Sequence, residues 1–125
     1  HGGLAHESKV DIEYIDAEAV AIRGPQRMLE GIDAVCVPGG FGQRGSEGKI
    51  AAIQWAREHK IPFFGICLGM QMAVVEFARN VAGVADAQSG EFAPNAEHKI
   101  IDLMTDQEGV TQKGGTMRLG AYDCD

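Results

Sequence analysis

The sequence predicts an α/β domain in which a mostly parallel sheet is flanked by helices. Two short apolar runs, residues 34–37 and 62–66, are typical of strands buried on both faces. A glycine-rich turn follows each run, and a helical pattern follows each turn. This order is typical of a parallel sheet whose ligands bind at the carboxyl ends of the strands.

The chain before the first apolar run contains one strand pattern and one breaker. Apolar and polar residues alternate over residues 10–15, which predicts a half-buried strand. Gly24 and Pro25 interrupt residues 16–32. We therefore expect a loop in this segment, with one helical turn around Gln26–Glu30.

Two helices are predicted after the two apolar runs. Ser46 is placed to cap a helix that begins at Glu47, and an apolar stripe continues that helix to about Lys60. A second helical pattern begins directly after Cys67 and extends to about Asn80.

The remainder of the chain gives weaker patterns. Residues 81–99 are polar and are expected to be irregular, and residues 100–104 predict a short strand. Residues 106–115 predict a turn region, and residues 116–119 a last strand. A length of 125 residues corresponds to one domain.

Charge and cysteine usage limit the function classes. The net charge of −7 argues against nucleic acids and anionic membranes as partners. No apolar stretch approaches a membrane span, and the N-terminus has no signal-peptide pattern. Cys36, Cys67 and Cys124 are an odd number without metal-ligand spacing, so we expect a reduced, cytoplasmic setting and no metal site. Cys36 lies within an apolar run and is expected in the core, and Cys124 is expected to be structural.

Residues 65–69, Gly-Ile-Cys-Leu-Gly, have the form of a thiol nucleophile elbow. The flanking glycines allow a turn so sharp that the Cys67 sulfur would point above the sheet. Amides at the start of the helix that follows would favour a thiolate and a developing oxyanion. A buried structural cysteine is the alternative interpretation, and the strand and helix on either side favour the elbow.

The second glycine-rich turn, residues 38–42, can present a backbone N–H to an oxyanion. Together the two turns predict an acyl-transfer site. Such a site also needs a base, usually histidine. The candidates are His1, His6, His59 and His98, and the surroundings of all four predict surface positions.

Three segments, residues 37–45, 65–71 and 114–120, resemble the class I (triad-type) glutamine amidotransferases, and specifically the glutaminase domain of CTP synthases. The resemblance implies that Cys67 attacks the side-chain amide of glutamine and forms a glutamyl thioester. It also implies that the amides of Gly40 and Leu68 form the oxyanion hole. It further implies that the substrate is contacted by Gly40, Leu68, Gly69, Met70, Gln71 and Glu91. Phe41 and Arg44 are implied as candidates for a regulatory role, in a lid or in the response to GTP.

The same resemblance implies partners beyond the chain. Ammonia would pass to a synthetase domain that uses ATP and Mg²⁺ to aminate UTP, with GTP as allosteric activator and a homotetramer as the intact enzyme. No cofactor is expected within the present segment. The family's His-Pro-Glu stretch has no counterpart here, since no His-x-Glu occurs. Residues 1–125 are therefore expected to be a partial domain, incomplete at both ends and inactive alone.

Two other interpretations remain. One is a cysteine peptidase or another hydrolase built on the same elbow, but residue 68 is leucine where the peptidase type has histidine. The other is a catalytically silent interaction module. The reactivity of the Cys67 thiol distinguishes the silent module from the enzymes.

Overall fold

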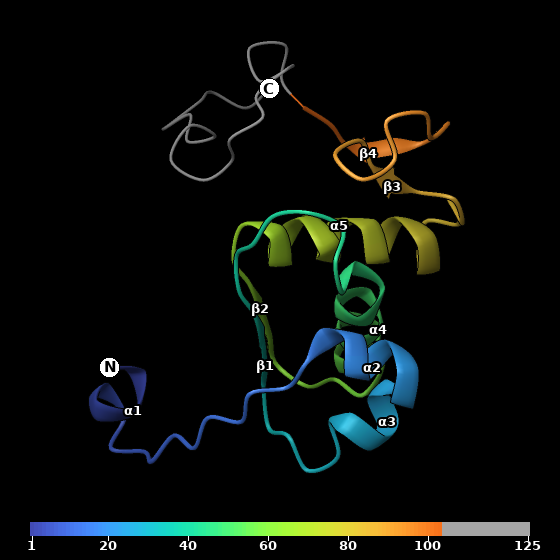
Figure 1. Cartoon of the computed structure of the whole chain (residues 1–125). Coiled ribbons are helices and arrows are strands. Elements are labelled where there is room, and N and C mark those ends of the chain that lie inside the picture. The colour runs from blue at the N-terminus through green and yellow to red at the C-terminus, as the bar shows by residue number, and fades with distance from the viewer. Residues whose placement is uncertain (104–125) are drawn as a thin grey trace.

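The computed structural model describes residues 1–103. The predicted strand at 116–119, the motif at 114–120 and Cys124 lie outside these described residues. Within residues 1–103, no helix has the length and apolar character needed to cross a membrane. The elements are α1 (Gly2–Ala5), α2 (Ala17–Arg23), α3 (Pro25–Met28), β1 (Val35–Val37), α4 (Ser46–Glu58), β2 (Phe63–Gly65), α5 (Leu68–Asn80), β3 (Gln88–Ser89) and β4 (Lys99–Ile101) (Figure 1).

The two predicted central strands pair as expected. β1 and β2 are parallel, with Val35 opposite Phe63 and Val37 opposite Gly65. Helices α2, α3 and α4 lie on one side of this pair (Figure 1). Because both strands run in the same direction, the turns after Val37 and Gly65 meet at one edge of the sheet.

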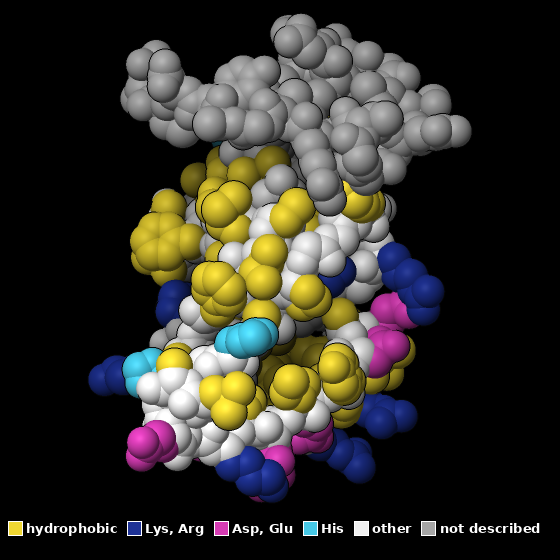
Figure 2. Space-filling model, turned by 90° about the vertical axis from the view of Figure 1, so that its left-hand side faces the viewer, with side chains coloured by type: hydrophobic (Ala, Val, Ile, Leu, Met, Phe, Trp, Pro, Cys, Tyr) yellow, Lys and Arg dark blue, Asp and Glu magenta, His cyan; other side chains and the backbone are white. Residues whose placement is uncertain are grey.

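The expectation that these strands are buried on both faces is wrong. Val35 and Val37 are buried, but Cys36 between them is exposed. Phe64, opposite Cys36 in the register, is 65% exposed. Figure 2 views the molecule from this side and shows apolar side chains gathered on its surface. The described residues cover only one face of the sheet, so the prediction that Cys36 belongs to the core is also wrong.

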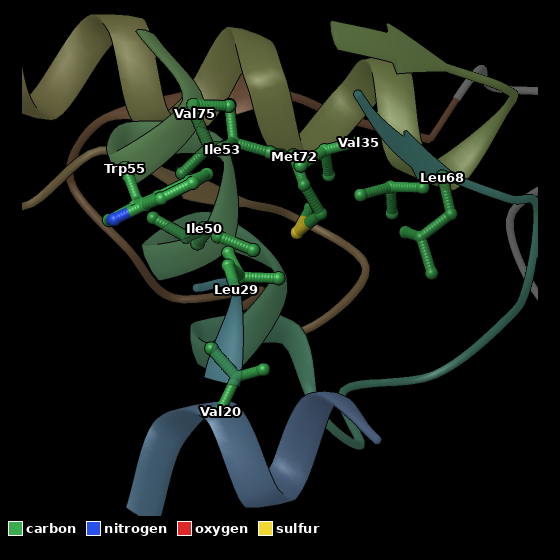
Figure 3. Close-up of a cluster of buried hydrophobic side chains, with 12 residues drawn as sticks. Val20, Leu29, Val35, Ile50, Ile53, Trp55, Leu68, Met72 and Val75 are labelled. Carbon is green, nitrogen blue, oxygen red and sulfur yellow. The ribbon is translucent and has the colours of Figure 1, made fainter. Parts of the chain in front are cut away.

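The core forms between the covered face of the sheet and the helices (Figure 3). It is built from apolar side chains of α2, α4, α5 and β1, together with Leu29, which directly follows α3. Its members include Val20, Leu29, Val35, Ile50, Ile53, Trp55, Leu68, Met72 and Val75. Leu68 follows Cys67 directly and is only 1% exposed, so the chain is anchored in the core one residue after the turn.

Both long helices occur close to their predicted bounds, and His59 follows the end of α4 as its C-cap. The predicted cap of α4 is wrong. The N-cap residue is Gly45, which adopts a left-handed conformation with φ of 68°, and Ser46 is the first helical residue. Ser46 makes no capping hydrogen bond because the chain enters the helix one residue earlier than expected.

Helix α2 was not predicted, because residues 16–32 contain a clear breaker. Its N-cap is Asp16, whose carboxylate accepts hydrogen bonds from the backbone N–H groups of Glu18 (2.7 Å) and Ala19 (3.1 Å). These two hydrogen bonds hold the pKa of Asp16 below its usual value, and the bond from Ala19 has the larger effect. The breaker separates two helices, since Gly24 ends α2 with φ of 84° and Pro25 starts α3.

The strand predicted for residues 10–15 does not form in the described structure. Val10, Ile12 and Tyr14 are 64%, 70% and 92% exposed. An alternating pattern forms a strand only beside a hydrogen-bonding neighbour, and neither described strand pair includes this segment. Residues 81–99, expected to be irregular, contribute the short strand β3. It pairs in parallel with β4, which overlaps the strand predicted for residues 100–104.

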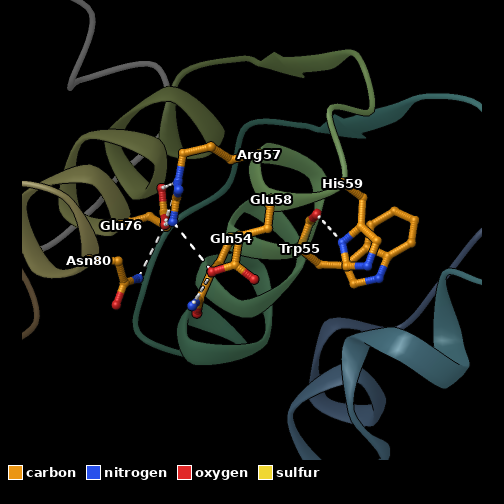
Figure 4. Close-up of polar contacts among 7 residues, drawn as sticks. All are labelled: Gln54, Trp55, Arg57, Glu58, His59, Glu76 and Asn80. Atoms are coloured by element: carbon orange, nitrogen blue, oxygen red, sulfur yellow. Dashed lines mark hydrogen bonds and ion pairs between the residues drawn. The ribbon is translucent and has the colours of Figure 1, made fainter.

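A buried polar cluster joins α4 to α5 (Figure 4). Glu76 of α5 is 1% exposed, and its carboxylate accepts hydrogen bonds from Arg57 Nη2 (2.8 Å) and Asn80 Nδ2 (3.1 Å). Arg57 Nε lies 3.1 and 3.2 Å from the two carboxylate oxygens. The Arg57 guanidinium balances the charge of the buried carboxylate, and Asn80 adds a neutral donor.

Candidate functional site: the Cys67 turn

Cys67 occupies a sharp turn between β2 and α5. Its backbone has φ of 51° and ψ of −110°, a conformation that non-glycine residues rarely adopt. Two backbone hydrogen bonds flank the turn, from Ile66 N to Val37 O (2.9 Å) and from Gly69 N to Ile66 O (2.9 Å). Cys67 is exposed and is the N-cap residue of α5. The geometry is that of a strand–turn–helix elbow.

The two glycines of the elbow are required by close backbone packing. A Cβ atom on Gly65 would lie 2.7 Å from Met70 N, in the first turn of α5. A Cβ atom on Gly69 would collide with the carbonyl oxygen of Val37 in the neighbouring strand β1. The Gly-x-Cys-x-Gly spacing therefore lets α5 start directly against the sheet, which holds Cys67 above the sheet edge.

The second glycine-rich turn lies against the first. A Cβ atom on Gly39 would be 3.3 Å from Cys67 Cβ and 4.0 Å from its Sγ. A Cβ atom on Gly40 would be 3.4 Å from Leu68 Cδ2. Among residues 1–103, no acceptor contacts the backbone N–H groups of Gly40 or Leu68. Gly39 thus packs on Cys67 and Gly40 packs on Leu68, and the amide of Leu68 belongs to the positive end of the α5 dipole.

Glu91 reaches the same region from a distant part of the chain. It follows β3, is half-buried, and its Oε1 accepts a hydrogen bond from the backbone N–H of Gly42 (3.3 Å). The pairing of β3 with β4 positions it, since the Gly90 amide donates to the Ile101 carbonyl oxygen (2.6 Å). The structure therefore brings Glu91 onto the turn that carries Gly40.

The other residues implied by the resemblance separate into two groups. Gly69, Met70 and Gln71 form the first turn of α5 beside Cys67, with Gly69 buried, Met70 exposed and Gln71 half-buried. Phe41 is 50% exposed on the glycine-rich turn. Arg44 instead pairs with Glu18 of α2, with Nε and Nη2 at 2.9 and 2.7 Å from Glu18 Oε2.

Glu18 is a contact that sequence reasoning missed, because it lies on the helix that was not predicted. Its hydrogen bond to Arg44, supported by the attraction of its charge, raises the pKa of the guanidinium above its ordinary value. The sequence did offer one indication of this helix. Asp16, two residues before Glu18, is a residue type that favours the N-cap position of a helix.

All four histidines are exposed, as the sequence predicts, and within the described residues none forms a hydrogen bond or ion pair with Cys67. The ring of His59 stacks on Trp55, with centroids 4.6 Å apart, and its Nδ1 lies 2.8 Å from the Trp55 carbonyl oxygen. His59 precedes β2 and Cys67 follows it, so they belong to opposite ends of that strand.

His98 belongs to an exposed group of possible metal ligands. Ligand atoms of Asp86, Glu97 and His98 lie within 4.8 Å of one another. The His98 ring is 2.9 Å from the Asp86 carboxylate, and this hydrogen bond raises the pKa of His98.

Comparison with known proteins identifies the family of the chain. The family model "Glutamine amidotransferase class-I" matches residues 1–125. CTP synthases of Geotalea uraniireducens and Prochlorococcus marinus are 58% and 52% identical to the chain over 124 residues, which is 99% of its length. The chain spans 23% and 22% of the length of these relatives.

A solved structure gives the same result. It is described as the Trypanosoma brucei CTPS glutaminase domain with bound acivicin. The match covers 84% of this chain and 41% of the solved chain, with a TM-score of 0.76 and 43% sequence identity. The predicted α/β fold with a parallel sheet and flanking helices is therefore confirmed. The chain belongs to the class I glutamine amidotransferases.

Proposed function

We propose that this chain is part of the glutaminase domain of a CTP synthase and supplies the nucleophile that releases ammonia from glutamine. The observation that carries the proposal is the exposed thiol of Cys67 on a strained turn, with Gly39 packed against it and α5 beginning at the next residue, Leu68. Acyl transfer needs a thiol, oxyanion donors and a base, and we assign the oxyanion donors to the backbone N–H groups of Gly40 and Leu68.

In the proposed reaction, Cys67 Sγ attacks the side-chain amide carbon of glutamine. The carbonyl oxygen becomes an oxyanion, which the backbone N–H groups of Gly40 and Leu68 stabilise. The proton that the thiol gives up passes, by way of a base, to the amide nitrogen. The carbon–nitrogen bond then breaks, ammonia leaves, and a glutamyl thioester remains on Cys67. Water hydrolyses the thioester to glutamate and restores the thiol.

The substrate is proposed to lie between the start of α5 and Glu91. The carboxylate of Glu91 suits the α-ammonium group of glutamine, and Gly69, Met70 and Gln71 would border the side chain. Glu91 also has a structural role, because its carboxylate accepts a hydrogen bond from the Gly42 amide. Substrate binding and the position of the oxyanion turn would therefore depend on the same carboxylate.

Substitutions of Glu91 can separate these two tasks. Glu91→Gln keeps an acceptor for Gly42 but removes the charge, whereas Glu91→Ala removes both. We expect both variants to weaken glutamine binding about tenfold, since a hydrogen bond to a charged group contributes about 1.5–3 kcal/mol. Hydrogen exchange at Gly42 should rise only in Glu91→Ala. Glu97→Gln, an exposed neighbour, is the control, and equal glutamine binding in Glu91→Gln and Glu97→Gln would contradict the assignment.

The wider role follows from the similarity to CTP synthases. We propose that the ammonia serves a synthetase domain that aminates UTP with ATP and Mg²⁺, with GTP as activator, in a cytoplasmic homotetramer. Phe41 and Arg44 remain candidates for the regulatory response. The 125-residue chain by itself is proposed not to turn over glutamine, since no histidine contacts Cys67 to accept and return the proton.

Glutamine protection tests this function without requiring turnover. The electrophile 6-diazo-5-oxo-L-norleucine resembles glutamine and alkylates thiols, so its addition to the protein can be followed by intact mass. L-glutamine is expected to slow the labelling in a saturable manner, and D-glutamine, the matched control, to leave it unchanged. Equal rates with and without L-glutamine would contradict a glutamine site. A thiol that does not react at all would favour a silent interaction module.

A further inference from the structure

The ion pair between Glu18 and Arg44 connects a surface helix to the turn beside Cys67. Arg44 lies four residues after Gly40, in the loop that joins β1 to α4. Both of its donating nitrogens contact one oxygen of Glu18, at 2.9 and 2.7 Å. The loop thus has a partner on α2 at one end and Glu91, through Gly42, in its middle.

Glu18 itself is held firmly. It lies in the first turn of α2, where its backbone N–H donates to the capping carboxylate of Asp16 at 2.7 Å. The helix packs closely on the start of α4, because a Cβ atom on Gly45 would lie 3.0 Å from Ala17 Cβ. A Cβ atom on Gly48 would collide with the Ala17 carbonyl oxygen. Helix α2 is therefore a fixed base from which Glu18 can hold Arg44.

The loop needs such support because its backbone is intrinsically free. Gly42 and Gly45 both adopt positive φ values, 81° and 68°, and residues 38–41 form no helix or strand. A glycine-rich loop loses much conformational entropy when it is ordered. Among the described residues, the other hydrogen bonds of this loop are from Ser46 N to Gln43 O (3.0 Å), from Lys49 N to Gly45 O (3.0 Å) and from Lys49 Nζ to Arg44 O (3.2 Å).

We propose that Glu18 is a positioning residue for the glycine-rich turn: by holding Arg44, it keeps residues 39–45 where Gly39 packs on Cys67 and Gly40 packs on Leu68. The role in catalysis rests on the proposed glutaminase function, whereas the effect on the loop does not. Arg44 is highly exposed, at 81%, so the contact is open to solvent and the effect is moderate.

The test compares Glu18→Gln, Arg44→Gln and their double variant with Glu13→Gln, which removes an exposed carboxylate ahead of α2. Two properties are measured on the 125-residue chain: hydrogen exchange of the amides in residues 41–45, and the labelling rates of Cys67. The labels are 6-diazo-5-oxo-L-norleucine and iodoacetamide. Only the first of these reagents needs the glutamine site.

In Glu18→Gln we expect loop exchange to rise, and labelling by the glutamine analogue to slow, each about threefold, the scale of an exposed ion pair. The rate of iodoacetamide labelling and the rate of hydrogen exchange in α4 and α5 should stay unchanged. A general loss of stability would instead raise the exchange rates in these helices as well. The double variant should be no worse than either single variant, as expected for a coupled pair.

The outcomes separate this inference from the proposed function. Loop exchange in Glu18→Gln equal to that of Glu13→Gln would overturn the positioning role. Faster loop exchange with unchanged analogue labelling would overturn its link to the thiol site. If L-glutamine gives no protection in the unaltered chain, the proposed function fails, while the exchange measurement still decides whether Glu18 holds the loop.

Discussion

Replacing Gly69 with alanine is expected to destabilise the protein by about 3 kcal/mol, the upper end of the usual range for overpacking. The added Cβ atom would collide with the Val37 carbonyl oxygen and lie 2.8 Å from the Val37 carbonyl carbon. Both are backbone atoms of β1, which cannot rotate away as a side chain can. Either α5 moves off the sheet or β1 shifts, and each movement disturbs Cys67. Urea unfolding followed by circular dichroism measures the loss.

The expected loss of stability in Gly69→Ala is opposite in sign to the usual effect of replacing glycine by alanine in a helix. Gly69 lies within a helix, where alanine is normally better than glycine by about 1 kcal/mol. A stabilised Gly69→Ala variant would therefore show that the close approach to Val37 does not exist. Gly2→Ala is the matched control, because Gly2 is also helical and a Cβ atom there would meet nothing within 4 Å. We expect its unfolding midpoint to be unchanged or slightly raised.

Removal of the Arg57 side chain is expected to have the second large effect. It leaves the Glu76 carboxylate buried with Asn80 as its one remaining partner among residues 1–103. An uncompensated buried charge costs about 3–5 kcal/mol. We expect the lower end for Glu76, since the Arg57 side chain is 36% exposed and water can enter in its place. The free energy of unfolding of Arg57→Ala, measured in urea, gives the value.

Two further variants identify the cause of that loss. Glu58→Ala removes the exposed carboxylate that lies 3.6 Å from Arg57 and should change stability little. Adding Glu76→Gln to Arg57→Ala should recover part of the loss, because the buried charge disappears. If the double variant is as unstable as Arg57→Ala, lost packing of the arginine stem accounts for the effect and the charge does not.

The elements that the sequence predicted well are those whose pattern is local. The helices after Ser46 and Cys67 have clear apolar stripes, and the glycine pairs mark both turns. The errors arise where a neighbour decides the outcome. Cys36 has the apolar surroundings of a core residue, yet the described residues leave its face of the sheet uncovered. Residues 10–15 alternate as a strand does but have no described strand beside them.

The same distinction applies to the candidate site. Cys67 and the two turns could be identified from spacing, because an elbow has a local steric requirement. Glu91 accepts a hydrogen bond from the amide of Gly42, which lies 49 residues earlier in the chain. Only the family resemblance indicated Glu91 as a site residue. Glu18 had no signal of its own, since its contact with Arg44 depends on how α2 packs against α4.

Peptide mapping after labelling with 6-diazo-5-oxo-L-norleucine tests the central claim most directly. We expect one label per chain, located on Cys67, with no label in Cys67→Ala and undiminished labelling in Cys36→Ala. Cys36 is the internal control, because it is also an exposed free thiol but lies within strand β1 and not on a strained turn at the start of a helix. A label found on Cys36 or Cys124, with Cys67 unmodified, would contradict the assignment of Cys67 as the nucleophile.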